Sequence, residues 1–302
     1  MFARPSRFLS VAVVGLLGAA CAATTRPAPP SPSLPPGPGP SASPVPSSDA
    51  SAPPASLLLK VTSEGGFINP AATLAALPIV TVYADGKIFT PAPVDAIAPG
   101  PLLPALNIRD VGPEGAKSIL AAIRTVGLDK PAAGGPGVPG DAGTDVFTVI
   151  VDGTTTTSRF VGGGPGGPGV GGGVTNPEQG AAIDLLSRLL DPAETWGAPS
   201  APEAAYTPSG YRIFVGPPNA QPDPTPGSSA VAWPLATALD AFGTPAVPDR
   251  GIAGLRQGVA LGTDAETLTP ILKSATTETT FTSAGKSFTL YVRPLLPDEA
   301  GS

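Results

Sequence analysis

Short runs of strand-forming residues that flank a turn dipeptide predict three β-hairpins in this chain. The turns are Asp85-Gly86, Asp152-Gly153 and Ala284-Gly285, and such dipeptides tolerate the backbone conformations of tight hairpin turns. The predicted strand pairs are 79–83 with 87–90, 146–151 with 154–160, and 280–283 with 287–292. Further strands are expected at 57–61 and 211–215, where apolar residues dominate.

Apolar residues that recur every three to four positions predict three helices. The segments are 113–126, a run from Pro177 to about residue 190, and a run that begins near Thr263. Proline favours the first turn of a helix, which supports the starts of the first two. Pro270 lies inside the third pattern, where it removes a backbone hydrogen bond, so we expect a kink or a short helix there.

The order of these elements predicts an α+β fold. A short strand, a helix and a hairpin follow one another twice, in 106–160 and again in 258–292. We therefore expect antiparallel sheets with helices on one face, arranged as two βαββ-like halves at 56–205 and 206–302. The order of elements leaves open whether the halves share one sheet. The glycine-rich tract 162–173 is expected to be a loop within the first half.

The N-terminal region has the pattern of a secretory signal with a lipid-attachment site. An apolar run at 8–20 follows Arg4 and Arg7 and ends at Cys21. The run is too short to span a bilayer, so residues 1–20 are expected to be a signal peptide. Lipidation of Cys21 would anchor the exported protein to the outer face of the cell membrane, whereas ordinary signal cleavage nearby would secrete it.

A disordered tether is expected between the anchor and the folded part. Residues 21–55 consist largely of proline, serine, alanine, glycine and threonine. This composition offers too little apolar surface to compensate for the loss of chain entropy on folding. A tether of this kind would hold a folded domain away from the membrane surface.

The inventory of reactive side chains excludes several classes of function. The chain of 302 residues contains no histidine and one cysteine, so catalytic Ser-His-Asp or Cys-His sites and histidine-ligated zinc are excluded. The net charge is −6, and lysines and arginines occur singly along the sequence, so nucleic acid is not an expected partner. No residue spacing indicates a catalytic site, a metal site or a cofactor site.

Three residues are candidates for a binding surface. Glu64 and Phe67 belong to a glycine-containing segment that follows the first predicted strand, although a turn explains the glycines equally well. Trp196 lies between a helix end and a proline-rich segment, so it is the aromatic residue most expected at the surface, while aromatic side chains in general are expected in the core. Asp298 and Glu299 are expected to form a solvated tail.

Several motifs resemble those of a group of exported proteins from high-GC bacteria that have no known activity. The motifs are Glu64-Gly65-Gly66-Phe67, Val82-Tyr83-Ala84-Asp85-Gly86 and Val292-Arg293-Pro294-Leu295-Leu296-Pro297-Asp298-Glu299. Many members of this group carry one cysteine in the strand before the last helix and another after the terminal Asp-Glu. This chain has other residues there, near Gly258 and at 300–302. The resemblance thus implies that a disulfide is missing and puts the docking of the tail in doubt.

The sequence favours a cell-envelope lipoprotein with a non-catalytic domain that binds a partner protein or an envelope glycan. The alternative is a histidine-independent hydrolase that acts on cell-wall polymer through paired carboxylates or a Ser/Lys dyad. The hydrolase requires two titratable groups that meet in a pocket, for which Glu64 is a candidate. A structural spacer, with neither pocket nor apolar patch, is the third interpretation.

Overall fold

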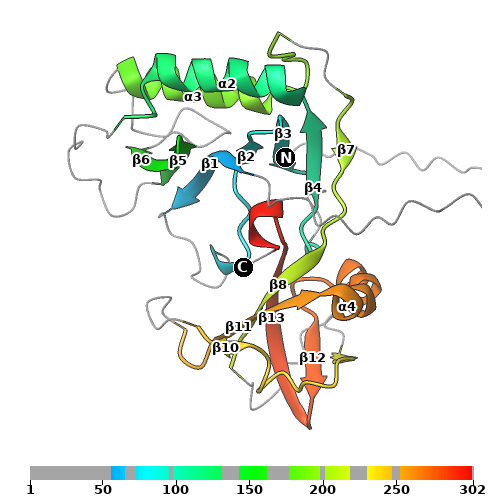
Figure 1. Ribbon diagram of the computed structural model, residues 1–302. Helices are drawn as coiled ribbons and strands as arrows, with labels where there is room; N and C mark the ends of the chain where they lie inside the picture. Colours follow the sequence, from blue (N-terminus) through cyan, green and yellow to red (C-terminus); the bar gives the residue numbers. More distant parts are fainter. Residues whose placement is uncertain are drawn as a thin grey trace, which may run out of the picture. The chain divides into compact units, whose positions relative to one another are not determined.

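The computed structural model describes most of the chain beyond residue 55 (Figure 1). The described residues are 56–64, 73–94, 98–130, 143–161, 177–197, 201–217, 230–246 and 252–300. Cys21, Phe67, the predicted signal peptide and tether, and the tract 162–173 lie outside them. Helices and strands form two sheets of the expected α+β class. Within the described residues, no helix has the length and apolar character needed to cross a membrane.

The first sheet has seven antiparallel strands in the order β6-β5-β1-β2-β3-β4-β7. Its strands are β1 (Leu57–Glu64), β2 (Val80–Tyr83), β3 (Lys87–Pro91), β4 (Leu106–Asp110), β5 (Thr144–Val151), β6 (Thr154–Val161) and β7 (Ala204–Ala205). Two helices, α2 (Gly112–Val126) and α3 (Pro177–Leu190), cover one face of this sheet (Figure 1). Ile119 and Ile123 of α2 and Leu189 of α3 are fully buried against Leu59 and Val61 of β1.

The second sheet has six strands in the order β10-β11-β8-β13-β12-β9. Its strands are β8 (Gly210–Val215), β9 (Ala230–Ala232), β10 (Thr244–Pro245), β11 (Arg256–Leu261), β12 (Thr280–Ser283) and β13 (Lys286–Pro294). Helix α4 (Gly262–Ser274) covers one face, where its Leu268 and Leu272 pack with Ile213, Val215 and Val292. Both sheets therefore have one face covered by helices.

The predicted βαββ order is confirmed in both halves, as β4-α2-β5-β6 and as β11-α4-β12-β13. All three predicted hairpins form, and positive φ values at Asp152 (50°) and Ala284 (49°) give two of them the expected tight turns. The two halves form separate sheets, which the sequence left open. In each half, strands from elsewhere lie between the strand that precedes the helix and the hairpin that follows it.

Helix α4 includes Pro270 and continues to Ser274. Pro270 and Glu266 are both exposed, so water can bind the Glu266 carbonyl group that lacks its usual helical partner. The helix begins at Gly262, one residue before the expected start. The proline is therefore accommodated on the solvent side of the helix, where the lost hydrogen bond has its smallest effect.

Gly86 fixes the contact between the first hairpin and the start of α2. Its φ of +93° lies in the region that favours glycine, and its N–H donates to the carbonyl of Tyr83. A Cβ atom at this position would lie 2.1 Å from the carbonyl oxygen of Gly112, the first residue of α2. The amide of Val111 in turn donates to the Gly86 carbonyl. Only glycine fits this close approach of two backbones.

A buried arginine links β4 to the end of α3. Arg109 is only 5% exposed, and its guanidinium donates to the carbonyl of Leu189 at 2.8 Å, to that of Glu194 at 3.1 Å and to that of Asp191. The last carbonyl groups of a helix have no partner within the helix. Arg109 therefore acts as the C-terminal cap of α3 from a neighbouring strand.

Each sheet also receives residues from the other half of the sequence. Leu102, which precedes β4, packs in the core of the second sheet and donates its amide to the Ala275 carbonyl. In the opposite direction, Leu296 follows β13 and packs with Tyr83 and Phe89 of the first sheet. Directly after Leu296 follows a short 3₁₀ helix, η2 (Pro297–Glu299), near the end of the described residues. Leu102 and Leu296 thus connect the two sheets, because each packs against the sheet of the other half.

Candidate functional site

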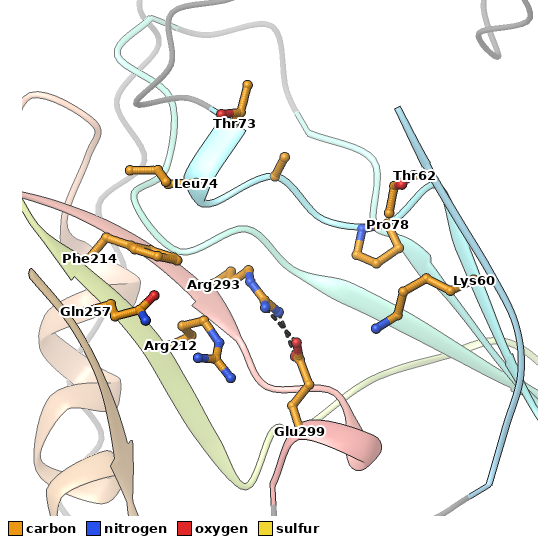
Figure 2. A pocket seen from close by; sticks show the side chains of 11 residues that line it. Lys60, Thr62, Thr73, Leu74, Pro78, Arg212, Phe214, Gln257, Arg293 and Glu299 are labelled. Carbon is orange, nitrogen blue, oxygen red and sulfur yellow. Dashed lines mark hydrogen bonds and ion pairs between the residues drawn. The ribbon is translucent and has the colours of Figure 1, made fainter. Parts of the chain in front are cut away.

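A pocket of about 350 Å³ lies between residues of both sheets (Figure 2). Volumes of about 300–1,000 Å³ are typical of sites that hold small organic ligands. The lining residues come from β1, the segment 73–78, β8, β11, β13 and η2. They are Lys60, Thr62, Thr73, Leu74, Ala76, Pro78, Arg212, Phe214, Gln257, Arg293 and Glu299.

Strand alternation places these side chains on the faces that the helices leave free. In β8, Ile213 and Val215 belong to the core under α4, so Arg212 and Phe214 point to the opposite face. In β1, Leu59 belongs to the core under α2 and α3, and the adjacent Lys60 lines the pocket. The pocket is therefore built where the helix-free faces of two sheets contribute side chains.

Two arginines lie directly opposite each other at the pocket wall. Arg212 of β8 and Arg293 of β13 are register partners on neighbouring antiparallel strands. Like charges at such cross-strand positions destabilise a sheet unless other groups compensate them. Glu299 compensates Arg293 through two parallel hydrogen bonds of 2.6 Å, in which both terminal guanidinium nitrogens donate to the carboxylate. Figure 2 shows this ion pair among the side chains that line the cavity.

Arg212 has no such compensation. Among the described residues, no ion pair to Arg212 is found, and its buried Nε–H has no acceptor. A buried donor without an acceptor costs about 1–3 kcal/mol. Because protein atoms cover Nε, an oxygen ligand in the pocket would meet the terminal nitrogens of this guanidinium.

The third cation of the pocket is held by the same short C-terminal helix. Lys60 pairs with Asp298 at 3.2 Å, and the fully buried Tyr83 donates its hydroxyl hydrogen to the other carboxylate oxygen of Asp298. Burial of the Tyr83 hydroxyl, together with its hydrogen bond to Asp298, raises the pKa of Tyr83 above its ordinary value. Tyr83 consequently stays a neutral donor, and η2 is fixed to β1 and β2 by polar contacts.

Glu299 is an ionised carboxylate in this setting. Burial alone would raise its pKa, but the hydrogen bonds and charge of Arg293, with the Leu296 amide, outweigh that effect and hold the pKa below its ordinary value. A carboxyl group that is ionised over the neutral range cannot act as a general acid. Glu299 therefore serves to position Arg293 and to reduce the positive charge of the pocket.

The pocket concentrates positive charge in an acidic chain. Three cations and one carboxylate line it, although the chain as a whole carries a net charge of −6. Lys60, Arg212 and Arg293 occur singly in the sequence, so no local pattern indicated this site. The sequence contained one indication of the site. Arg212 is a charged residue in the otherwise apolar strand Gly210–Val215, where a charge is rarely buried without a partner.

The expectation of a solvated tail at Asp298 and Glu299 is wrong. The side chain of Asp298 is 23% exposed and that of Glu299 is 15% exposed, and both form ion pairs. These ion pairs dock the tail on the sheets without a disulfide. The lack of cysteines near Gly258 and at 300–302 therefore does not prevent docking of the tail. The carboxylates of Asp298 and Glu299 fix this end of the described chain to β1, β2 and β13.

The residues predicted for a binding surface do not meet in one site. Trp196 is 3% exposed, so its predicted place at the surface is corrected to the core, where the Arg188 guanidinium lies 4.3 Å from its ring centre. Glu64 is exposed and pairs with Arg159 of β6. It lies on the same face of β1 as Lys60 and Thr62, beyond the edge of the pocket. Phe67 is outside the described residues.

Other carboxylates in and around the first sheet have local structural partners. Asp85 pairs with Lys87 beside it in the hairpin, and Asp110 accepts a hydrogen bond from the Gly112 amide at 2.8 Å. Asp95 lies outside the described residues. Asp145 is buried beside Ser63, and burial raises its pKa although the Ser63 hydrogen bond opposes this. None of these described carboxylates lines the pocket.

A second cavity of about 170 Å³ lies near the start of β8. Tyr206, Tyr211 and Lys273 contribute polar atoms, but the tyrosine hydroxyls already bond to the Leu295 carbonyl and to Thr269. It is smaller than typical ligand sites. Within the described part of the chain, no group of three or more acidic residues, histidines or cysteines could hold a metal ion.

The cationic pocket is thus the site that the geometry favours. Known proteins add nothing to this assignment, because the chain matches no protein-family model, no curated protein and no solved structure.

Proposed function

We propose that the folded domain is a non-catalytic binding module that holds a small anionic ligand in the pocket between its two sheets. The observation that supports this most directly is Arg212, a pocket cation that lies opposite a second arginine and has no anionic partner among the described residues. An anionic ligand would supply this missing partner through strong, charge-assisted hydrogen bonds.

The hydrolase alternative receives less support from the same pocket. A hydrolase without histidine needs two titratable groups with different protonation states on either side of the substrate. Among the described residues, Glu299 is the one carboxylate that lines the pocket, and its two oxygens are already bound to Arg293. Lys60 is paired with Asp298 and has no serine beside it in the pocket lining. A binding role fits these groups better than acid-base chemistry.

Anion binding is expected to depend on Arg212. In thermal melts of the full-length chain, at least one small anion from a panel of phosphate, sulfate, acetate and glucuronate should raise the melting temperature at constant ionic strength. A hundredfold excess over the dissociation constant corresponds to about 2.7 kcal/mol of stabilisation. Arg212→Gln should abolish this increase, because it removes the unpaired cation.

The matched control is Arg159→Gln, which removes an exposed arginine outside the pocket. Salts such as phosphate and sulfate also stabilise proteins by exclusion from the surface. The decisive quantity is therefore the difference between the two variants. Equal shifts in both variants, or no shift with any anion in the parent protein, would refute the proposal.

We also propose that the domain works outside the cell on a lipid anchor, as the N-terminal sequence predicts. Cys21→Ser should prevent lipid attachment and move the protein from the membrane fraction to the soluble fraction, because the lipid on Cys21 is the proposed anchor. Incorporation of labelled palmitate into the parent chain and its loss in the variant would measure this. A parent protein that is unlabelled and fully soluble would instead favour ordinary secretion.

A further inference from the structure

The charges of the pocket define which anion it can hold. Two of its three cations are neutralised by η2, because Glu299 pairs with Arg293 and Asp298 pairs with Lys60. The remaining positive charge belongs to Arg212. With η2 in place, a ligand with one negative charge balances the pocket, whereas a second negative charge would lie close to Glu299.

The guanidinium of Arg212 also favours a particular geometry. Arginine binds carboxylates through two parallel hydrogen bonds, because the fork of N–H donors matches the spacing of the two carboxylate oxygens. Protein atoms cover its Nε–H, so a ligand in the pocket would meet the two terminal nitrogens of the group, which can bind both carboxylate oxygens end-on. A single planar carboxylate fits both the charge and the donor arrangement of Arg212.

The other lining residues indicate the body of the ligand. Thr62 and Gln257 add a hydroxyl and an amide, which exchange hydrogen bonds with hydroxyl groups. Phe214 and Pro78 offer apolar surfaces that can contact carbon-bound hydrogens. A ligand with several hydroxyl groups on a compact carbon frame uses both kinds of surface, whereas a purely apolar body would leave the polar groups without partners.

We infer that the pocket binds a hydroxylated monocarboxylate with the chemistry of a uronic acid, either free or linked in a glycan. This inference rests on the proposed function of the pocket. The carboxylate pairs with Arg212, the hydroxyl groups meet Thr62 and Gln257, and one face of the sugar ring lies against Phe214. Glu299 excludes dianions from the same place by charge repulsion.

The test is calorimetric titration of the full-length chain with D-glucuronate, methyl glucuronide, D-glucose, acetate and inorganic phosphate. Glucuronate should bind at least tenfold more tightly than glucose, acetate or phosphate, because only it combines one carboxylate with a hydroxylated ring. Methyl glucuronide distinguishes a free uronic acid from one linked in a glycan, because its anomeric oxygen is substituted as in a glycan. Binding equal to that of glucuronate supports a glycan-linked residue, and at least tenfold weaker binding supports the free acid.

Two variants connect the result to the pocket. Arg212→Gln should weaken glucuronate binding at least tenfold, and Arg159→Gln should leave it unchanged. Arg212→Lys keeps the charge but loses the planar fork, so it should retain only part of the affinity. The comparison of ligands on the parent protein needs no variant, and it stands even if a substitution at position 212 impairs folding.

If phosphate binds more tightly than glucuronate and Arg212→Gln abolishes phosphate binding, the inferred ligand class is wrong, but the pocket is still an anion-binding site. Equal affinity for acetate and glucuronate would also overturn the inferred ligand class, since the hydroxylated ring would then contribute nothing. No binding of any probe would overturn both this inference and the proposed function.

Discussion

Arg109→Leu is expected to lower the free energy of unfolding by about 3–5 kcal/mol, the largest effect that we predict for a single substitution. The guanidinium is buried and donates to three carbonyl groups at the end of α3 and the turn beyond it. Leucine fills part of the volume but supplies no donor. The buried Leu189 carbonyl and the part-buried carbonyls of Asp191 and Glu194 would then lack this partner, and the loss costs most at Leu189, which water cannot reach.

Urea denaturation of the two proteins at neutral pH measures this difference. Arg159→Leu is the matched control, because Arg159 is an arginine on a strand whose side chain is 55% exposed and pairs with the exposed Glu64. Its effect should stay within about 1 kcal/mol. Arg109→Lys should be intermediate, since one ammonium group cannot reach all three carbonyl oxygens. Similar values for Arg109→Leu and Arg159→Leu would show that the cap of α3 contributes little.

Glu299→Gln is expected to destabilise the protein by about 1.5–3 kcal/mol at neutral pH, because it leaves two neighbouring arginines without a counter-charge. The effect should depend on pH. The folded state holds the pKa of Glu299 below its ordinary value of 4.5, so the ion pair contributes fully above that pH. Its contribution is lost as the pH falls through the lower pKa of the folded state.

The difference in stability between parent and Glu299→Gln should therefore be constant from pH 6 to 8 and decrease below about pH 4.5. Chemical denaturation at several pH values measures it. Glu64→Gln is the control, since the Glu64 side chain is 50% exposed and its ion pair is screened by solvent. A pH-independent difference would mean that the charge of Glu299 does not stabilise η2.

Local signals in the sequence were sufficient to predict the elements whose formation is decided locally. The hairpin at Asp152-Gly153 and the helix that starts beside Pro113 have turn and cap residues within a few positions, and both formed as expected. The short strands β7, β9 and β10 have two or three residues each and were not predicted. Their neighbours, not their own sequence, hold them in the sheet.

The candidate site could not be predicted, because it depends on convergence of distant residues. Lys60, Arg212 and Arg293 are isolated charges in the sequence, and only strand pairing and the packing of two sheets bring them to one cavity. For Trp196, the sequence led to a wrong prediction of surface exposure, whereas the side chain is buried. Its surroundings along the chain are polar and proline-rich, but α2 and α3 cover it. Solvent exposure is a property of the tertiary structure and is poorly encoded in neighbouring residues.

Leu102 packs in the core of the second sheet and Leu296 packs against the first sheet, so each half needs the other to complete its core. A fragment 56–205 would leave Tyr83 and Phe89 without the side chain that packs on them, and a fragment 206–302 would lack Leu102 in its core. The halves are therefore not independent folding units, and unfolding should be a single cooperative transition. During synthesis, the first sheet cannot reach its final packing until Leu296 has been added, and Glu299, which lines the pocket, follows three residues later.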